Sequence, residues 1–557
     1  GYNVGTSNNA DFNILRLVWT NYINYNKSIK RHNIFLTIGH EAQTQTQKSL
    51  SANGSSISDP FFIAENYISG SGATQTINGT YDVRDGFLSY FGRVNYDFGN
   101  KYFLQASIRR DGQSALAPGN KYGIFPGFSV GWRLSEERFW KPRIINELKL
   151  KASYAKVGNT LPGYPYLSTF GARNYGNLGG IAPTQVGNPP LKWETSAKYD
   201  VGIEVGILKS RIMFTADWFL NDVDKLVLDV PFSPSAGIPG STTLDGGAIS
   251  QNVGTLQNRG IELTLNLGLV RSKDFSWDMN VNYSHVKNKV TSLYPVGGVP
   301  ATTLTRGNYN IIKVGEPMDI LWGYRSAGVN AANGNPMFYK ADGSMVQLNL
   351  NRAFGTSTIG VFYYAVSNND PNLGVATSLT AADKANLGVS TPTYYGGFSN
   401  TFTYKGFGLD VMFRFSGGNS IMNYTRQEVL FNQSFQNNGS EILNRWTTPG
   451  QVTDVPKLYY GQAANINQTA SANSRFVEKG DYIRLQNLVL SYTFDAVNLE
   501  KRSRGYIKAA KFFVQGQNLY VWTKYKGADP DNISTLGVDA AVSPQVRNIS
   551  AGFSFVF

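Results

Sequence analysis

The sequence has no cysteine among its 557 residues, so it has neither a disulfide framework nor a thiolate ligand for a metal. Histidine is almost as rare. Only His32, His40 and His285 are present, and their spacing does not match the HExxH pattern of a zinc protease. The sequence also lacks a P-loop for nucleotide phosphates. We therefore expect no catalytic centre, no enzyme activity and no cofactor.

The sequence also lacks a long apolar run, and about 18 such residues are needed for a transmembrane helix. The mean hydropathy is −0.25. The strands of a membrane barrel escape such a search, because only alternate residues face lipid. The first residues, Gly1–Asn13, lack the charged and apolar regions of a signal peptide. We therefore expect that the natural start is either processed or lies upstream.

Lysine and arginine number 51 against 38 aspartates and glutamates, which gives a formal net charge of +13. Such an excess suits nucleic acid, anionic lipid or an anionic ligand. The basic residues are scattered along the sequence, so we expect no nucleic-acid partner. The 58 glycines, 32 tyrosines, 33 phenylalanines and 9 tryptophans instead favour β-structure with tight turns and aromatic girdles at membrane interfaces.

Many stretches alternate apolar and polar side chains, which is the period of a strand with one apolar face. The last ten residues, Asn548–Phe557, show this alternation. Tyr199–Ile207 and Ile212–Trp218 form the clearest predicted hairpin. Between Ile483 and Leu490 the phase is ambiguous, and we expect a β-bulge there.

The connections between these strands differ in length. Short turns follow Phe98, Leu208, Leu267 and Tyr404, whereas long polar stretches follow Gln43, Gly158, Asp222, Lys287, Gly417 and Thr523. Outer-membrane barrels have short periplasmic turns and long extracellular loops. The charged residues on the polar side of the strands suit a watery or plugged lumen rather than a dry core. We therefore predict an all-β fold, an antiparallel transmembrane β-barrel with long extracellular loops.

The number of strands suggests that this barrel is incomplete. About fifteen strands are predicted, and hairpin-connected strands alternate in direction, so the first and the last would run the same way and could not pair antiparallel. Bacterial single-chain barrels have an even number of strands. We therefore expect residues 1–557 to be one domain, the C-terminal part of a larger barrel whose first strands lie upstream.

Several stretches resemble one family of membrane proteins. They are Phe91–Trp140, Leu148–Thr160, Asn188–Leu208, Asn444–Pro456, Arg475–Phe494 and Val514–Asp531. Together they span most of the chain in the order of the family. The sequence resembles the SusC/RagA-type TonB-dependent transporters of Bacteroidetes outer membranes.

This resemblance implies a barrel of about twenty-two strands, the class whose lumen is plugged. It also implies TonB-dependent import of oligosaccharides or peptides together with a SusD-like surface lipoprotein. The plug, the N-terminal domain and the segment that contacts TonB are not recognisable in the sequence, so we expect them upstream of Gly1. An alternative function is that of a scaffold subunit in a larger outer-membrane complex.

Four aromatic residues in a predicted loop are candidate ligand-binding residues that would stack on sugars or peptide side chains: Tyr164, Tyr166, Phe170 and Tyr175. Packing within the loop, or contact with the lipoprotein, is the favoured alternative. Asp529 and Asp531 are weak candidates for a structural calcium site, which needs six to eight oxygen ligands. The favoured role of these two aspartates is to form turns, so we expect no metal.

Further aromatic residues are predicted to contact the membrane. Trp218, Trp277, Tyr283, Tyr404 and Tyr492 are expected at the interface with outer-membrane lipid and lipopolysaccharide. The terminal strand resembles the C-terminal signal that the outer-membrane assembly machinery recognises. Phe553, Phe555 and Phe557 would carry this signal.

Overall fold

The computed structural model describes residues 5–57, 75–141, 144–175, 178–231, 248–293, 302–352, 359–366, 376–432 and 437–557. The chain divides into two compact units. Unit 1 comprises Gly1–Phe139, Leu150–Val201 and Asn221–Thr255. Unit 2 comprises Trp140–Lys149, Gly202–Leu220 and Leu256–Phe557.

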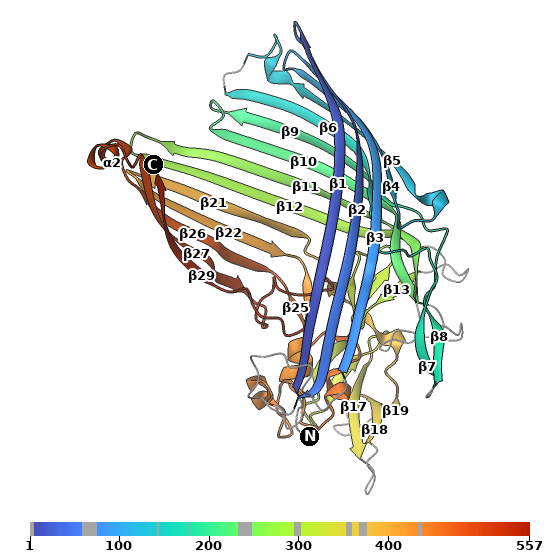
Figure 1. Ribbon diagram of the computed structural model, residues 1–557. Helices are drawn as coiled ribbons and strands as arrows, with labels where there is room; N and C mark the ends of the chain where they lie inside the picture. Colours follow the sequence, from blue (N-terminus) through green and yellow to red (C-terminus); the bar gives the residue numbers. More distant parts are fainter. Residues whose placement is uncertain are drawn as a thin grey trace. The chain divides into compact units, whose positions relative to one another are not determined.

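The largest sheet has fifteen strands, which confirms the predicted number (Figure 1). In the order of their hydrogen-bonded neighbours the strands are β1 (Gly5–Ile29), β2 (His32–Ile57), β3 (Gln75–Phe98), β4 (Tyr102–Gln113), β5 (Tyr122–Arg133), β6 (Ile145–Asn159), β9 (Glu194–Ile207), β10 (Ile212–Pro231), β11 (Ala248–Arg271), β12 (Phe275–Leu293), β21 (Tyr394–Tyr404), β22 (Phe407–Gly417), β26 (Tyr482–Thr493), β27 (Ala509–Thr523) and β29 (Asn548–Val556). The strand order follows the sequence order, as in a meander of hairpins.

Unit 1 contains strands much longer than a membrane requires. β1 and β2 have 25 and 26 residues, whereas about 9 to 11 residues cross a bilayer. The predicted start of the long connection, after Gln43, was therefore wrong, because β2 continues to Ile57 and β3 begins at Gln75. The backbone ladder between β1 and β2 continues through polar residues such as Asn53, which pairs with Asn8. Side-chain polarity does not end a strand whose backbone groups still find partners.

A second small sheet lies in the long connection between β6 and β9. It consists of β7 (Thr169–Tyr175) and β8 (Leu178–Gln185), which pair with each other. Unit 1 also contains a buried cluster of Leu116, Phe125, Leu191 and Trp193.

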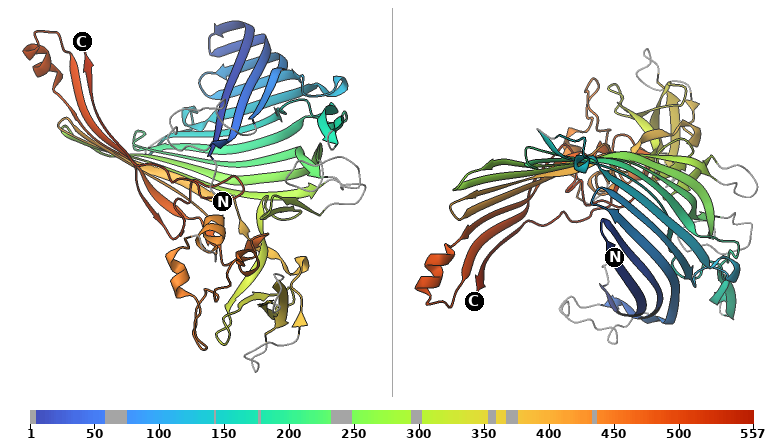
Figure 2. Two further views of the ribbon diagram at one scale, coloured as in Figure 1. Left: turned by 60° about the horizontal axis from the view of Figure 1, so that its bottom comes forward. Right: turned by 90° about the horizontal axis from the view of Figure 1, so that it is seen from above.

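Unit 2 contains the predicted bulge. The register of β26 shifts by one residue against both β22 and β27. Gln486 is the extra residue opposite β22, whereas opposite β27 it faces two residues, Asn518 and Leu519. Its Nε2 donates a hydrogen bond to Oδ1 of Asn518 at 2.8 Å. Because of the bulge, Leu485 and Leu488 lie on the same face of the strand, although their numbers differ in parity. Figures 1 and 2 both show β26, β27 and β29 side by side, with the C-terminus next to α2 (Ala496–Arg502).

The long connections of unit 2 also contain secondary structure. We call their described residues, between 302 and 393, 418 and 481, and 524 and 547, the loop lobe. Its larger sheet contains β13 (Thr303–Arg306), β14 (Asn310–Lys313), β15 (Ile320–Val329), β16 (Pro336–Tyr339), β17 (Met345–Arg352), β18 (Ile359–Ala365), β19 (Ala376–Thr377), β20 (Ala385–Val389) and β24 (Ala472–Asn473). Its smaller sheet contains β25 (Val477–Lys479), β23 (Ser420–Asn423) and β28 (Val538–Asp539).

The helical segments of the described residues are short. They are the α-helices α1 (Ala463–Asn467) and α2, the π-helix η6 (Thr425–Leu430), and the 3₁₀ turns η2 (Pro118–Asn120), η3 (Leu134–Glu136), η5 (Ala381–Asp383) and η7 (Ser440–Asn444). Among the described residues, no helix has both the length and the apolar character to cross a membrane.

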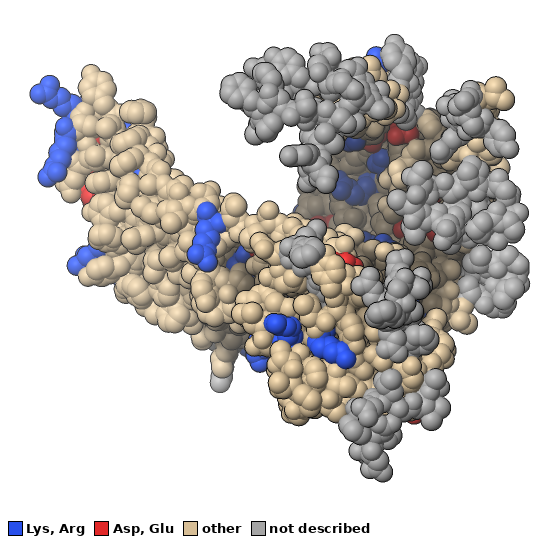
Figure 3. All heavy atoms as spheres, turned by 90° about the horizontal axis from the view of Figure 1, so that it is seen from below, with Lys and Arg blue, Asp and Glu red and all other residues tan. Residues whose placement is uncertain are grey.

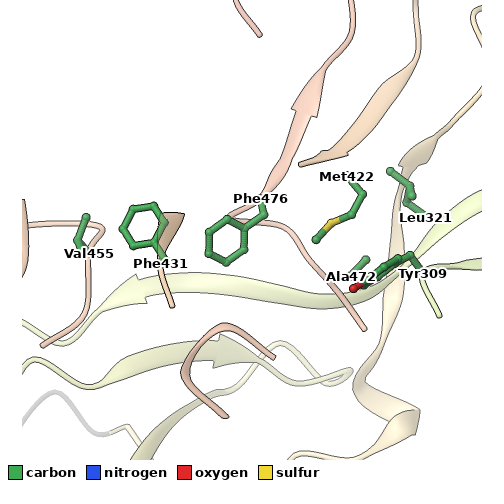
Figure 4. Packing of buried hydrophobic residues seen from close by; sticks show 7 residues of the cluster. All are labelled: Tyr309, Leu321, Met422, Phe431, Val455, Ala472 and Phe476. Carbon is green, nitrogen blue, oxygen red and sulfur yellow. The ribbon is translucent and has the colours of Figure 1, made fainter. Parts of the chain in front are cut away.

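The loop lobe has a conventional buried core. One cluster brings together residues far apart in the sequence: Tyr309, Leu321, Met422, Phe431, Val455, Ala472 and Phe476 (Figure 4). A second cluster contains Phe338, Val346, Leu348, Leu350 and Ile466. The loop lobe therefore folds around apolar residues that are removed from water.

The strands of the large sheet show the opposite arrangement. On one face of β4 and β5, Ile108, Ile124 and Phe128 are 56%, 58% and 51% exposed. The same holds in unit 2, where Leu490 is 55% and Ile549 is 74% exposed. A contiguous apolar face of this kind is an aggregation hazard in water and a requirement in lipid.

Candidate ligand-contacting surfaces

The aromatic loop of unit 1 divides into a packed part and an exposed part. Tyr164 and Tyr166 are partly buried, with ring centroids 6.4 Å apart in an edge-to-face arrangement. The Oγ of Ser114 donates a 3.5 Å hydrogen bond to the Oη of Tyr164, and Gln185 donates to the carbonyl oxygen of Tyr164 at 2.8 Å. These two tyrosines therefore help to hold the loop together, and their contact with a ligand stays a prediction.

The other two aromatic candidates lie on the β7–β8 hairpin. Phe170 is 66% exposed. The register of the hairpin places it on the same face as Ile181, which is 81% exposed, whereas Leu178 belongs to the opposite face. Tyr175 pairs with Leu178 through the backbone, and its side chain lies outside the described residues. The hairpin thus offers an exposed apolar surface made by Phe170 and Ile181.

The polar face of the unit 1 strands carries paired charges. Arg109 of β4 makes ion pairs with Glu41 of β2 at 3.3 Å and with Asp111 at 2.6 Å. These side chains lie on the face opposite Ile108. On this face the two carboxylates neutralise the positive charge of Arg109. On the molecular face shown in Figure 3, lysine and arginine residues lie in separate groups rather than in one continuous patch.

In unit 2 the two aspartates proposed for calcium bind arginines instead. Asp529 accepts a hydrogen bond from Arg484 at 2.6 Å. Asp531 accepts from Arg414 at 2.5 Å and from the hydroxyl of Tyr482 at 2.7 Å. Guanidinium groups supply the positive charge that calcium would otherwise bring, so this arrangement fixes a loop onto β22 and β26. Within the described ranges, no cluster of three or more potential metal ligands is present.

Register places four of the five predicted interface aromatics on the apolar face of unit 2. Phe407 of β22 pairs with Tyr404 of β21 on one side and with Tyr492 of β26 on the other, at the end of the strands that carries the short turns. Trp277 stacks on Phe402, with centroids 5.4 Å apart, and Tyr283 lies beside Phe415 nearer the long loops. Trp218 lies in β10 and is 45% exposed. Contact of these residues with the membrane interface stays a prediction.

The C-terminal strand β29 pairs with β27, and its phenylalanines are exposed. Phe553, Phe555 and Phe557 are 67%, 49% and 76% exposed. Their rings form a continuous row, with centroids 6.1 Å and 6.3 Å apart. Such a row of accessible rings suits recognition by another protein, and its role as an assembly signal stays a prediction.

A buried arginine pair in the loop lobe was not predicted. Arg426 donates to both carboxylate oxygens of Glu441 and forms a 3.2 Å ion pair with Glu478. Its neighbour Arg475 lies over the ring of Phe431, 4.5 Å from the centroid. Burial, and then the positive charge of Arg426, lower the pKa of Arg475 to about 10. This cluster joins distant segments, so no local sequence pattern could have revealed it.

One short string in unit 1 matches the GxSxG pattern of a nucleophile elbow. It is GFSVG, residues 127–131, in the middle of β5. Ser129 pairs across the sheet with Gln105 of β4. A nucleophile elbow requires a sharp turn from a strand into a helix, and a continuous strand does not supply it.

These features define a class of protein. Long antiparallel strands expose one apolar face and carry paired charges on the other, and long loops follow at one end of the strands. This is the arrangement of an outer-membrane β-barrel. A family model described as "TonB dependent receptor-like, beta-barrel" matches residues 1–363. The chain belongs to this TonB-dependent receptor family of the outer membrane.

Relatives of this chain occur in Bacteroidetes. The chain is 28% identical over 565 residues to "TonB-dependent receptor P3" of Formosa agariphila, a match that covers 96% of the chain and 52% of that relative. It is 26% identical over 498 residues to "TonB-dependent receptor SusC" of Bacteroides thetaiotaomicron, which covers 86% of the chain and 44% of that relative. The chain thus spans about half the length of the curated relatives that it matches.

A solved structure shows the same fold. The chain matches the "Structure of the RagAB peptide transporter" with a TM-score of 0.78 and 22% sequence identity. The match covers 99% of this chain and 56% of that chain. The predicted fold and the predicted resemblance to the SusC/RagA family are therefore both confirmed.

Proposed function

We propose that this chain forms most of the barrel of a nutrient importer of the SusC/RagA type. The barrel would take up oligosaccharides or peptides with energy from TonB. The observation that carries this proposal is the division of the strands into an apolar exposed face and a charged opposite face, in a chain of the TonB-dependent receptor family. A charged, watery interior suits passage of polar cargo.

The β7–β8 hairpin supports a protein partner at the loop end. Phe170 and Ile181 form an exposed apolar surface on one face of this hairpin. Large exposed apolar side chains on an extracellular loop are typical of a protein contact. The occupant we propose is a SusD-like surface lipoprotein, which the resemblance to the SusC/RagA family implies and which fits the similarity to the RagAB peptide transporter.

The aromatic loop supports a proposal about where cargo is positioned. The partly buried rings of Tyr164 and Tyr166 pack edge to face, and such rings offer flat apolar surfaces on which sugars or peptide side chains can stack. Because Tyr164 also helps to hold the loop together, a ligand would contact a preformed surface. We assign these residues a positioning role for cargo and assign Phe170 to the partner.

The partner contact can be tested with opposite faces of the same hairpin. The full-length protein would carry Phe170→Asp with Ile181→Asp, and the matched control would carry Leu178→Asp. We expect the double variant to lose co-purification with a SusD-like lipoprotein from the same organism, and the control to retain it. Equal retention in both variants would contradict the assigned surface.

The import function is tested by deletion of the gene for this chain, followed by growth on defined glycans or peptides as the sole nutrient. We expect loss of growth on one substrate class, with rescue by the intact gene. If all nutrients still supported growth while assembly of the envelope failed, the importer would be the wrong proposal and the scaffold alternative would stand.

A further inference from the structure

A pocket of about 750 Å³ lies at the loop end of β21, β22, β26 and β27 in unit 2. Its walls are largely apolar and aromatic, formed by Tyr394, Phe415, Ile483, Tyr520 and Trp522. The rings of Tyr520 and Trp522 meet edge to face, with centroids 4.7 Å apart. No step in the proposed import of cargo uses this pocket.

The register of the strands shows which face of the sheet the pocket opens on. Phe415, Ile483 and Trp522 form one row of directly paired residues across β22, β26 and β27. The next row contains Arg414 and Arg484, which point to the other face and bind the loop aspartates. The pocket therefore opens on the apolar face, which meets lipid, and not on the charged interior.

Three charged residues stand at the end of this pocket next to the long loops. Lys479 closes β25, and Lys524 follows directly after β27. Both lysines are exposed. Asp481 is the third charge, and its carboxylate accepts hydrogen bonds from the backbone nitrogen of Gly418 at 2.6 Å and from the hydroxyl of Tyr394 at 3.2 Å.

The two lysines differ from their neighbour Lys526. Lys526 lies 4.0 Å from a carboxylate oxygen of Glu441. Within the part of the chain that the structure describes, neither Lys479 nor Lys524 has a carboxylate within ion-pair distance. With Asp481 engaged by Tyr394 and by the backbone, the rim of the pocket carries a net charge of +1 and two available ammonium groups.

An apolar cavity on a lipid-facing surface with cations at its outer rim matches an anionic amphiphile. The long loops of outer-membrane barrels are extracellular, and lysine side chains near a membrane surface extend to the headgroup level. We propose that this pocket binds a phosphorylated lipid of the outer leaflet. Its acyl chain would lie on Ile483 and Trp522, and its phosphate would bind Lys479 and Lys524.

This assignment rests on the outer-membrane location of the chain and is independent of its cargo. It predicts that the charge of the headgroup and the depth of the apolar pocket both contribute to binding. A small soluble phosphate would use only the lysines, and a neutral lipid would use only the apolar wall. The two contributions can therefore be measured separately.

The test uses the full-length protein, purified in detergent, and native mass spectrometry with phosphorylated lipid A as the probe. The variant is Lys479→Glu with Lys524→Glu, and the matched control is Lys405→Glu, an exposed lysine in the short turn after β21. We expect the double variant to bind about thirtyfold more weakly or worse, because each lysine near an anionic headgroup contributes roughly a factor of five. The control should bind like the unaltered protein.

Two further arms make the outcome decisive. Dephosphorylated lipid A should bind as weakly to the unaltered protein as phosphorylated lipid A binds to the double variant. Millimolar inorganic phosphate should not displace the lipid. Equal binding by all three proteins, or displacement by inorganic phosphate, would overturn the proposal. The milder pair Lys479→Gln with Lys524→Gln repeats the measurement if charge reversal prevents folding.

Discussion

The loop lobe and the membrane strands of unit 2 use apolar residues in opposite ways. In the loop lobe, Phe338 and Leu348 are 1% and 0% exposed and belong to the same buried cluster. In the strands, Phe553 and Ile549 are 67% and 74% exposed. The two regions have similar chemistry and differ in the solvent that surrounds them, since water drives the burial of one set and lipid accepts the other.

This difference shows where stability resides in each region. The loop lobe depends on close packing and on buried ion pairs, as any soluble domain does. The strands depend on the backbone ladder and on the absence of charge from one face. The same substitution is therefore expected to have different effects in the two regions.

The largest effect is expected from truncation in the core of the loop lobe. Phe338→Ala should lower the free energy of unfolding by about 3 to 5 kcal/mol, because it leaves a cavity. Leu490→Ala, on the lipid face of β26, should cost much less, because lipid chains can fill the space. Urea unfolding of the full-length protein, followed by protease sensitivity of the loop lobe, measures both. Equal losses would contradict the division between the two regions.

A similar loss is expected from breaking the buried arginine cluster. Arg426→Ala removes the guanidinium that pairs with both Glu441 and Glu478 and should cost about 3 to 5 kcal/mol. The control is Arg271→Ala, which breaks an exposed 3.1 Å pair with Asp278 and should cost about 0 to 1 kcal/mol. The same unfolding measurement compares the two variants. A larger loss of stability at Arg271 would contradict the stabilising role assigned to the buried Arg426 cluster.

A charge on the lipid face should have the next largest effect. Leu490→Lys is expected to cost about 2 to 4 kcal/mol, depending on its depth in the membrane. The control is the adjacent Val489→Lys, whose side chain belongs to the polar face with Asp410 and Gln515. Folding into lipid vesicles, scored by heat-modifiable migration, distinguishes them. Equal folding of the two variants would show that the assigned faces are wrong.

The smallest expected effect is a dependence of loop-lobe stability on pH. Burial raises the pKa of Glu441, but hydrogen bonding to Arg426 and its positive charge outweigh burial, so the pKa lies below its ordinary value. A depressed pKa adds stability that is complete above the unfolded value of about 4.3 and is lost as pH falls through the folded value.

The measurement for this prediction is protease resistance of the loop lobe between pH 7 and pH 3. The unaltered protein should lose resistance more steeply below about pH 4.3 than Glu441→Gln, which carries no titrating group at this position. Parallel pH curves would show that the Glu441 and Arg426 pair does not contribute in this range.

The strands of the large sheet were predictable because each one alternates over many residues. Tyr199–Ile207 and Ile212–Trp218 fall within β9 and β10, and the terminal pattern forms β29. The small sheets of the loop lobe were not predicted, because strands such as β19, with two residues, are too short to show a period. Their pairing depends on partners distant in sequence, such as β24 beside β15.

The sequence predicted the chemical character of the candidate residues but not which residues they contact. The aromatic character of Tyr164 and Phe170 is visible in the sequence, yet only the structure separates a packed ring from an exposed one. The two aspartates near Asp529 suggested a turn or a cation, whereas the arginines that bind them come from strands more than 40 residues away. Electrostatic partners across a sheet leave no local pattern.

The single extra residue at Gln486 has a consequence for which sequence changes the strand can accept. After Gln486 in the sequence, the residues on the lipid-facing side have even numbers, as Leu488 and Leu490 do. Before it, the residues on that side have odd numbers, as Ile483 and Leu485 do. A substitution at position 486 keeps the number of residues in β26, so both halves of the strand keep their apolar side chains on the same face. Loss of this residue, or gain of another, would exchange the faces of one half and turn Arg484 toward the acyl chains. We therefore expect β26 to tolerate substitutions at position 486 better than insertions or deletions there.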